Sequence, residues 1–506
     1  MSTSENNKRI AKNTMFLYIR MGLTMLISLY TSRIVLNALG IEDYGIYNIV
    51  GSFIVSFTFI SAPLGGTTQR FLSYAIGEND GIKLNKLFNL SCFCYLIIAL
   101  FIFFLLELGG SWFILNKMQF PDNRSDAILN VFHLSSLSLI LGLIKTPFDS
   151  LIISKEKMSF YAYISIVEVL LQLLNAFSLV YFSCDKLILY AFNVFAIRFL
   201  VLIIVSFFSI RSFHEIRLHF CWDSKLVKQM MSFSGWTFFS SVSTMTANQG
   251  LNILLNMFFG VVLNAAMGLA TQISNAVNQF VSSFQMAFNP QIVKLYASGN
   301  LKEMQSLVLK TAKYSYFLLF GIVCLVIYNM QYILNLWLKD TPDYTVVFTS
   351  YLLIWILIET LMAPLWMSVI ATGVIKKYHI TMSLLIFLNI IFSYVFLKLG
   401  FPPEIIVINK CWLDVVYLVV RLLFTKKLIG LSIKDFLNKV IAPVIVLSLI
   451  FIVPNHFLYR MLDDNFIKLL SSIILLAFFY PVLVLFIGIT KKERNSILHI
   501  LLHKTK

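Results

Sequence analysis

The sequence is poor in charged residues. Asp, Glu, Lys and Arg make up 13% of its 506 residues, whereas a typical soluble domain has about 25%. Hydrophobic residues make up 59%, and apolar runs of about 20 residues recur along the chain. This composition excludes an ordinary soluble protein and indicates one that crosses a membrane many times.

Motifs of energy-coupled and hydrolytic enzymes are also missing. No GxSxG, HExxH, Walker or Rossmann pattern occurs, so we expect neither an ATPase engine nor a catalytic residue. The six cysteines mostly lie in or beside hydrophobic segments, and Cys92-x-Cys94 has neither redox nor zinc spacing. We therefore expect no cofactor and no metal site. Residues 1–12 are polar and basic without a cleavage site, so no removable signal peptide is expected.

Long loops are lacking as well. The positive-inside rule applies to short loops, so the distribution of Lys and Arg can be used to predict topology. With both termini in the cytoplasm, 26 of the 40 Lys and Arg residues fall in the tails and cytoplasmic connections, and 8 fall in outer connections. This asymmetry follows the positive-inside rule and predicts a multi-pass membrane protein with cytoplasmic termini. The net charge of +16 is explained without nucleic acid as a partner.

The two halves of the chain carry matching landmarks. Tyr74-Ala-Ile-Gly recurs as Tyr296-Ala-Ser-Gly, an offset of 222, and Gly260 matches Gly40 at an offset of 220. Pro147 and Tyr161 recur as Pro364 and Tyr378, at an offset of 217. A nearly constant offset indicates a duplication. Each copy holds about six apolar segments, an even number, so both copies enter the membrane from the same side as parallel repeats.

These observations predict an all-α integral membrane protein with about 14 transmembrane helices. Two six-helix lobes, related by a parallel pseudo-two-fold axis, are followed by two C-terminal helices. The predicted parts are an N-lobe with helices 1–6, a cytoplasmic inter-lobe loop, a C-lobe with helices 7–12, and helices 13–14 with a basic cytoplasmic tail. They cover residues 1–212, 213–228, 229–428 and 429–506, respectively. Such an arrangement is typical of a transporter whose working site lies between the halves.

Polar stripes mark two of the apolar helices in the second half. Carboxamides repeat at i, i+3 and i+7 on each helix, which places each set on one helical face. Carboxamides can hold helices together, or they can line a polar cavity and bind sugar hydroxyls. We predict that they line a cavity and bind substrate. The two sets are Gln249, Asn252 and Asn256 on the first helix, and Gln272, Asn275 and Gln279 on the second.

Three arginines lie within the first two apolar segments. Arg20 is about seven residues into the first helix, where it could reach the headgroups or bind an anion within the cavity. Arg33 lies 13 residues further on, which rotates it about 140° from Arg20 on an ideal helix. Arg70 is expected near the cytoplasmic end of the second segment, where it could equally anchor the helix at the interface. We predict all three as substrate-binding residues.

Four further charges fall near the middle of apolar helices, where ionisable groups are costly and are usually functional. Arg198 and Asp414 occupy equivalent positions in the two copies, at an offset of 216. They could pair across the lobes, or each could serve its own lobe. Glu168 and Glu359 could be buried structural carboxyls or could take up protons or cations. We predict these four as coupling residues, whereas Lys145 and Asp149 are expected to form a local ion pair.

Several short motifs resemble those of the O-antigen and capsule repeat-unit flippases, the Wzx-type branch of the multidrug/oligosaccharidyl-lipid/polysaccharide exporter superfamily. The resemblance extends from about residue 10 to residue 435. The matching stretches are TSRIVLNALGIEDYGIYNIV (31–50), FSGW (233–236), NQGLNILLNMFFG (248–260), NPQIVKLYASGN (289–300), LWL (336–338) and ATG (371–373).

The resemblance implies a two-lobed architecture with a cationic central cavity. It also implies the substrate, an oligosaccharide repeat unit on undecaprenyl pyrophosphate, which moves from the cytoplasmic to the periplasmic leaflet. By analogy, Arg20 and Arg33 fall on the helix that supplies cavity arginines in related lipid flippases. The amide-rich second half departs from a uniformly cationic cavity. The expected partners are this lipid-linked oligosaccharide, membrane lipid and a coupling ion, either proton or sodium. The expected oligomeric state is a monomer, and association with polysaccharide polymerase machinery stays open.

Other functions must be weighed against this one. A drug or cation antiporter of the same superfamily would need an apolar, aromatic cavity with acidic groups, which Arg20 and the amide stripes disfavour. A peptidoglycan-precursor lipid flippase follows the same physics and is harder to separate. A membrane polysaccharide polymerase would need a sizeable external loop, and no outer connection exceeds about 20 residues.

Overall fold

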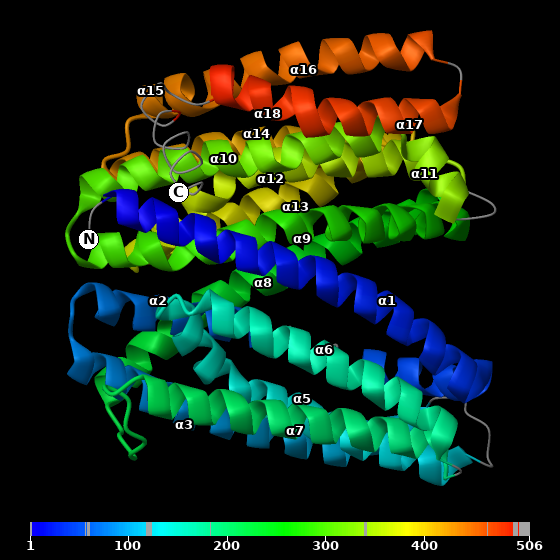
Figure 1. Cartoon of the computed structure of the whole chain (residues 1–506), viewed down its shortest axis with the longest axis vertical. Coiled ribbons are helices and arrows are strands. Elements are labelled where there is room, and N and C mark those ends of the chain that lie inside the picture. The colour runs from blue at the N-terminus through cyan, green and yellow to red at the C-terminus, as the bar shows by residue number, and fades with distance from the viewer. Residues whose placement is uncertain are drawn as a thin grey trace, which may run out of the picture. The chain divides into compact units, whose positions relative to one another are not determined.

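The computed structural model describes residues 3–55, 57, 61–117, 124–182, 184–337, 342–462, 464–488 and 494. The described part of the chain is helical and contains no strand (Figure 1). Ten of its helices are long and apolar enough to cross a membrane. The predicted all-α membrane fold is therefore confirmed, while the number of fourteen spans stays a prediction. The chain divides into two compact units, which we describe separately.

Unit 1 comprises residues 1–241 and 293–299. Its central helix is α5, which contains Pro147 and packs against α1, α2, α3, α6 and α7. The start of α8 and the last residues of α9 also belong to this unit. Its helices are α1 (Thr3–Val55), α2 (Ser61–Gly77), α3 (Gly81–Leu105), η2 (Leu106–Gly110), α4 (Ser111–Lys117), α5 (Ser125–Ser154), α6 (Met158–Tyr181) and α7 (Lys186–Ser212).

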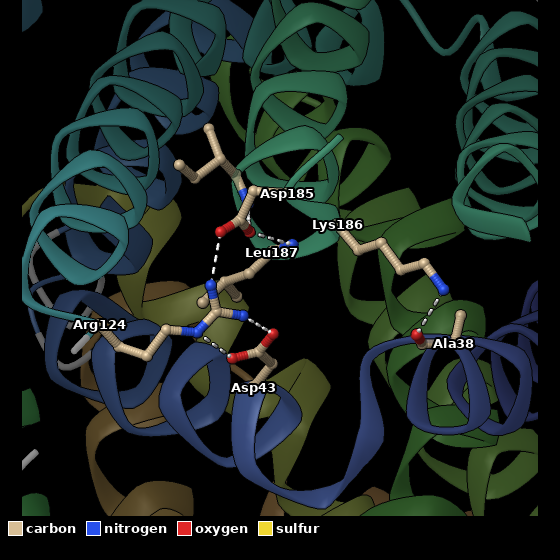
Figure 2. A network of polar contacts seen from close by, with 7 residues as sticks. Ala38, Asp43, Arg124, Asp185, Lys186 and Leu187 are labelled. Carbon is tan, nitrogen blue, oxygen red and sulfur yellow. Dashed lines mark hydrogen bonds and ion pairs between the residues drawn. The ribbon is translucent and has the colours of Figure 1, made fainter. Parts of the chain in front are cut away.

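Ion pairs join three of these helices where α5 and α7 begin (Figure 2). Arg124 lies between two carboxylates: its Nε is 3.0 Å from Asp43 Oδ1, and its Nη1 is 2.5 Å from Asp185 Oδ2. The hydrogen bond to Asp43 is the main reason that the pKa of Arg124 is raised above its ordinary value. Asp185 also accepts a hydrogen bond from the backbone N–H of Leu187, capping α7. One guanidinium therefore ties α1 to the starts of α5 and α7.

Unit 2 comprises residues 242–292 and 300–506. Its central helix is α12, which contains Pro364 and packs against α10 and α14. Its helices are α8 (Ser224–Phe259) and α9 (Val261–Ala297) in part, α10 (Leu301–Tyr328), α11 (Met330–Trp337), α12 (Thr345–Thr372), α13 (Lys376–Lys398), α14 (Ile405–Ile429), α15 (Ile433–Phe436), η4 (Leu437–Ile441), α16 (Ala442–Met461), α17 (Asn465–Ile474), η5 (Leu475–Phe479), α18 (Tyr480–Leu483) and η6 (Val484–Gly488).

The C-terminal helices α16 and α17–η6 form a side-by-side pair against α10 (Figure 1). The Tyr480 hydroxyl donates to the carbonyl of Phe317 at 2.5 Å, and Tyr316 shares a hydrogen bond with Ser448 at 2.9 Å. Gly321 permits the close approach, since a Cβ there would lie 2.4 Å from Leu476 Cδ1. Small residues and interhelical hydrogen bonds are what join helices inside a membrane.

The backbone of the described residues repeats as the sequence predicts. Gly40 kinks α1 with φ 79°, and Gly260 separates α8 from α9 with φ 80°, a conformation that favours glycine. Asn79 and Gly299 also share positive φ in equivalent turns, at an offset of 220. The tetrapeptide match at an offset of 222 is thus two residues out of register with the backbone. These backbone matches support the duplication, which stays a prediction together with its axis.

Candidate functional site

The carboxamide stripes lie on one face of α8 and α9 within unit 2. All six side chains, Gln249, Asn252, Asn256, Gln272, Asn275 and Gln279, are exposed. Other faces of the same helices are buried, with Leu255 and Ala270 fully covered in an apolar cluster that includes Phe348 of α12. The sequence therefore folds these helices with an apolar face inward and a polar face outward.

These amides do not join the helices of unit 2 to one another. Within the described part of the chain, none of the six carboxamide groups makes a hydrogen bond, although the backbone carbonyl of Gln279 accepts one from Ser282. A polar helix face is unfavourable against lipid, where polar groups have no partners. It can face a polar ligand or water instead, and an amide offers both a donor and an acceptor to a hydroxyl group.

Arg20 is held against α6 in unit 1. Its guanidinium carbon lies 5.1 Å from the centre of the Tyr161 ring, a cation–π contact. Its Nε is buried and has no hydrogen-bond partner. A buried donor without a partner is costly. The contact with Tyr161 was not predictable, because no sequence periodicity links α1 with α6.

Next to Arg20 and Tyr161, unit 1 contains a cluster of charges. Lys145 Nζ lies 3.5 Å from Asp149 Oδ2, which confirms the predicted local ion pair. The same ammonium is 4.0 Å from Glu168 Oε2 on α6. Tyr161 interacts electrostatically with Arg20, Asp149 and Lys145. Arg20, Lys145, Asp149, Tyr161 and Glu168 together are the unit 1 cluster. It brings the predicted residues Arg20 and Glu168 into one region.

The other predicted arginines of unit 1 lie in different surroundings. Arg33 is exposed on α1. Arg70 is buried, 8% exposed, with its guanidinium carbon 4.8 Å from the ring centre of Phe71 and 5.2 Å from that of Phe233. Arg198 is exposed on α7 and lies against α5, where its Nη1 is 3.7 Å from the place a Cβ on Gly142 would occupy. The three do not join the unit 1 cluster, and their roles in binding or coupling stay predictions.

Unit 2 contains a second charged cluster, between α12 and α14. Asp414 is 2% exposed and interacts electrostatically with Glu359, Lys410 and Arg421. The Lys410 ammonium lies 3.6 Å from the centre of the Trp355 ring, a close cation–π contact. Arg421 Nη2 is 3.9 Å from Glu359 Oε1. Glu359, Lys410, Asp414, Arg421 and Trp355 together are the unit 2 cluster.

Sequence reasoning missed the two cations of this cluster. Lys410, Asp414 and Arg421 are spaced by four and seven residues along α14, which places them on one helical face. That spacing was the available signal. The Lys410–Trp355 contact crosses from α14 to α12 and leaves no such pattern. The cluster is electrically mixed, and two carboxylates and two cations can exchange partners when a proton or another cation binds.

Comparison with known proteins places the chain in a family. A family model described as "Polysaccharide biosynthesis protein" matches residues 10–296, more than half of the chain. The uncharacterized membrane protein EpsK of Bacillus subtilis is 20% identical over 303 residues, which are 58% of each chain.

Solved structures of similar fold are transporters. An outward-facing multidrug resistance MATE family transporter of the MOP superfamily matches with a TM-score of 0.72 at 12% identity. A MOP superfamily transporter from Pyrococcus furiosus matches with a TM-score of 0.70 at 14% identity. Each match covers 84% of this chain and 96% of the other. At these identities the likeness establishes the MATE-like transporter fold alone.

Proposed function

We propose that this chain, which belongs to the polysaccharide biosynthesis protein family, is a flippase for oligosaccharide repeat units linked to undecaprenyl pyrophosphate. It moves them from the cytoplasmic to the periplasmic leaflet of the bacterial inner membrane, by alternating access of its two repeats. The family and the transporter fold support the coarser assignment, a multi-pass membrane transporter in polysaccharide biosynthesis. The finer assignment rests on the chemistry of the residues below.

The observation that carries the proposal is the exposed amide face of α8 and α9. Its six carboxamides have no hydrogen-bond partner among the described residues and stand on helices with an apolar opposite face. A glycan has many hydroxyl groups, each both donor and acceptor, and amides match that chemistry. Organic cations offer no such pattern. We therefore assign this face to the sugar.

We assign binding of the pyrophosphate, the anionic part of the substrate, to Arg20. A guanidinium forms strong bidentate hydrogen bonds with phosphate, and the Arg20 side chain is only half-buried, so part of it is open to a ligand. The Tyr161 ring contacts the guanidinium through a cation–π interaction. The lipid tail stays in the bilayer while the polar head crosses within the protein. No bond is made or broken, so the proposed role is transport without catalysis.

Coupling is proposed at Arg198, Glu168, Glu359 and Asp414. Moving one charge through the membrane field is worth about 2.3 kcal/mol per 100 mV. A ligand or ion shifts the two states only if it binds one of them better. In the unit 2 cluster, uptake of a proton or sodium ion would change which cations the carboxylates pair with.

Cysteine scanning tests the sugar-binding face. Each of the six amide positions is replaced singly by Cys in a variant without the native cysteines, and the protein in liposomes is treated with a small polar thiol reagent. We expect modification at these positions and protection by saturating lipid-linked oligosaccharide. Asn175 is the matched control, since it is buried and donates to the carbonyl of Tyr190, so Cys there should not react. Lack of reaction at all six positions would show that they hold helices together.

A cation antiporter is the alternative that the unit 2 cluster favours. Asp414 and Glu359 could hold an organic cation, as an antiporter of this fold would need. Transport assays in the same liposomes separate the two. Flipping of lipid-linked oligosaccharide that is insensitive to added organic cations supports the flippase. Uptake of organic cations without any flipping would replace it with the antiporter. A peptidoglycan-precursor flippase is distinguished by offering that lipid as the competing substrate.

A further inference from the structure

The connection between α7 and α8 is pinned along α3. Phe213 and Ile216, which are 6% and 2% exposed, anchor its start in the core of unit 1. Beyond them the backbone N–H of Arg217 donates to Asn85 Oδ1 at 3.0 Å, and that of His219 donates to Asn89 Oδ1 at 3.1 Å. Asn89 Nδ2 donates back to the Arg217 carbonyl at 2.9 Å. The segment is thus fixed by two side chains of one helix.

The contacts with α3 also show in which direction the segment runs along that helix. Asn85, Asn89 and Phe93 are four residues apart on α3 and share one face. Asn85 and Asn89 are about one helical turn apart. The segment that is hydrogen-bonded to both therefore runs roughly 5–6 Å along α3, toward its apolar part. There Phe93 packs edge-on against Phe220, with ring centres 5.1 Å apart, and against Trp222 at 5.7 Å. The segment therefore rises alongside a membrane helix before α8 begins.

The face of α3 that it covers continues as an apolar exposed surface. Further along the same helical face, Ile97, Leu100 and Phe104 are 48%, 47% and 58% exposed. Such a surface on a membrane-spanning helix faces lipid. The segment lies on the same face, one to two turns nearer the start of the helix. It therefore lies where the bilayer meets water.

The segment itself is amphipathic. Leu218, Phe220 and Trp222 alternate along it and are 55%, 74% and 51% exposed. Trp and other aromatic residues favour the membrane–water interface. The polar backbone, which would be costly there, is satisfied by Asn85 and Asn89. Alternation in an extended chain turns three apolar side chains to one side and the intervening residues to the other.

The charges around the segment are cationic. Arg211, Arg217, Lys225 and Lys228 are exposed. Both acidic residues of the segment are engaged: Glu215 pairs with Lys155, and Asp223 caps α8 by accepting from the backbone N–H of Lys225 at 3.0 Å. Exposed Lys and Arg next to a membrane attract anionic headgroups.

We propose that residues 214–223 are an interfacial strap that inserts Leu218, Phe220 and Trp222 into the anionic lipid surface on the predicted cytoplasmic side. The partner is the phospholipid bilayer. The connection between α7 and α8 is then a fixed membrane anchor within unit 1. This inference depends on the membrane-spanning fold and is independent of the transported substrate.

Photocrosslinking tests the strap. Benzoylphenylalanine replaces Phe220 in the full chain, which is reconstituted in vesicles of phosphatidylcholine with or without phosphatidylglycerol and irradiated. Phe101, 67% exposed on α3, is the lipid-facing control, and the exposed Glu303 on the first turn of α10 is the polar control. We expect lipid adducts at 220 in a yield comparable to that at 101, a higher yield with phosphatidylglycerol, and none above background at 303.

The pinning is tested in the same assay. Replacing Asn85 and Asn89 by Ala together should release the strap and lower the lipid adduct at 220. Asn130→Ala is the matched control, because the Asn130 amide donates only to the backbone carbonyl of Asp126 on its own helix. Lipid adducts at 101 without lipid adducts at 220 would overturn the proposal. The same irradiation in native membranes gives a second check: if residue 220 crosslinked there only to another protein and not to lipid, the proposal would also be overturned. An unchanged yield in the double variant would overturn the pinned geometry. None of these readouts requires transport.

Discussion

The two repeats place different charges at the same helix crossing. In unit 1, Arg198 of α7 lies against Gly142 of α5. The equivalent residues in unit 2 are Asp414 and Glu359, at offsets of 216 and 217, on helices α14 and α12. At these equivalent positions the second half carries two acidic residues where the first carries an arginine and a glycine. A repeated scaffold can therefore serve two different chemistries at one depth.

The charged residues at the two crossings also differ in how far they are buried. Arg198 is exposed, whereas Asp414 is 2% exposed and needs Lys410 and Arg421 near it. A charge that is buried in protein without a compensating partner is expensive. This explains why the sequence of α14 carries two additional cations that α7 lacks at the corresponding depth. It also indicates that unit 2 stability depends on its cluster more than unit 1 depends on Arg198.

The largest effect should follow removal of a cation from the unit 2 cluster. Lys410→Met leaves Asp414 buried with less compensation, and breaking a buried ion pair costs about 3–5 kcal/mol. Arg198→Met should cost less, because it leaves no buried carboxylate without its cation. Thermal unfolding in lipid nanodiscs compares the two. Equal losses would remove the difference between the crossings. Partial recovery in Lys410→Met with Asp414→Leu would locate the cost at the carboxylate.

A second comparison concerns Arg20 and Arg33, both on α1. Arg20→Ala should lower flipping about 10- to 100-fold, because a hydrogen bond to a charged group contributes about 1.5–3 kcal/mol. Arg20→Lys should retain part of the activity, and Arg33→Ala should change it less, since Arg33 is exposed and outside the unit 1 cluster. Initial rates of flipping in liposomes measure this. Wild-type rates in Arg20→Ala, with normal levels of folded protein, would return Arg20 to a headgroup-anchoring role.

A third prediction concerns the close contact at the end of α2. A Cβ on Gly77 would lie 2.6 Å from the Lys294 carbonyl oxygen and 2.7 Å from Ala297 Cβ. Gly77→Ala should therefore destabilise the protein by about 1–3 kcal/mol, as overpacking usually does. Gly66→Ala, on the same helix with no atom within 4 Å of its Cβ position, is the control. If both variants melted at the same temperature, the end of α9 would not pack here.

The smallest effect is expected at the Arg124 network of unit 1. The guanidinium is 28% exposed, and ion pairs at that exposure contribute about 0.2–1 kcal/mol. Arg124→Met should lower the melting temperature slightly, and the loss should shrink in high salt, which screens exposed charges. A salt-independent loss as large as that of Lys410→Met would show that the network is as critical as the unit 2 cluster.

Features governed by the backbone were predictable from the sequence. Gly40 and Gly260 both occupy positive φ, a conformation that selects glycine, so the repeat left a visible trace. Lys145 and Asp149 were predictable because i and i+4 meet on any helix. The amide stripes were visible for the same reason.

Contacts between helices were not predictable. Arg20 with Tyr161, Lys145 with Glu168, and Lys410 with Trp355 each depend on the rotation of two packed helices. A single helix encodes its own faces, and its neighbour's rotation is set by packing over the whole unit. The inter-lobe segment shows the same limit. Its Phe and Trp were visible, but its attachment to Asn85 and Asn89 depends on where α3 lies.

The contact between Gly77 and Ala297 also shows what the predicted repeat requires at one pair of positions. At the backbone offset of 220 these two residues correspond to each other, and a Cβ on Gly77 would lie 2.7 Å from the Cβ of Ala297. Two alanines at these corresponding positions would therefore collide. The two copies can keep similar backbone turns at this contact only because one carries glycine where the other carries a methyl group.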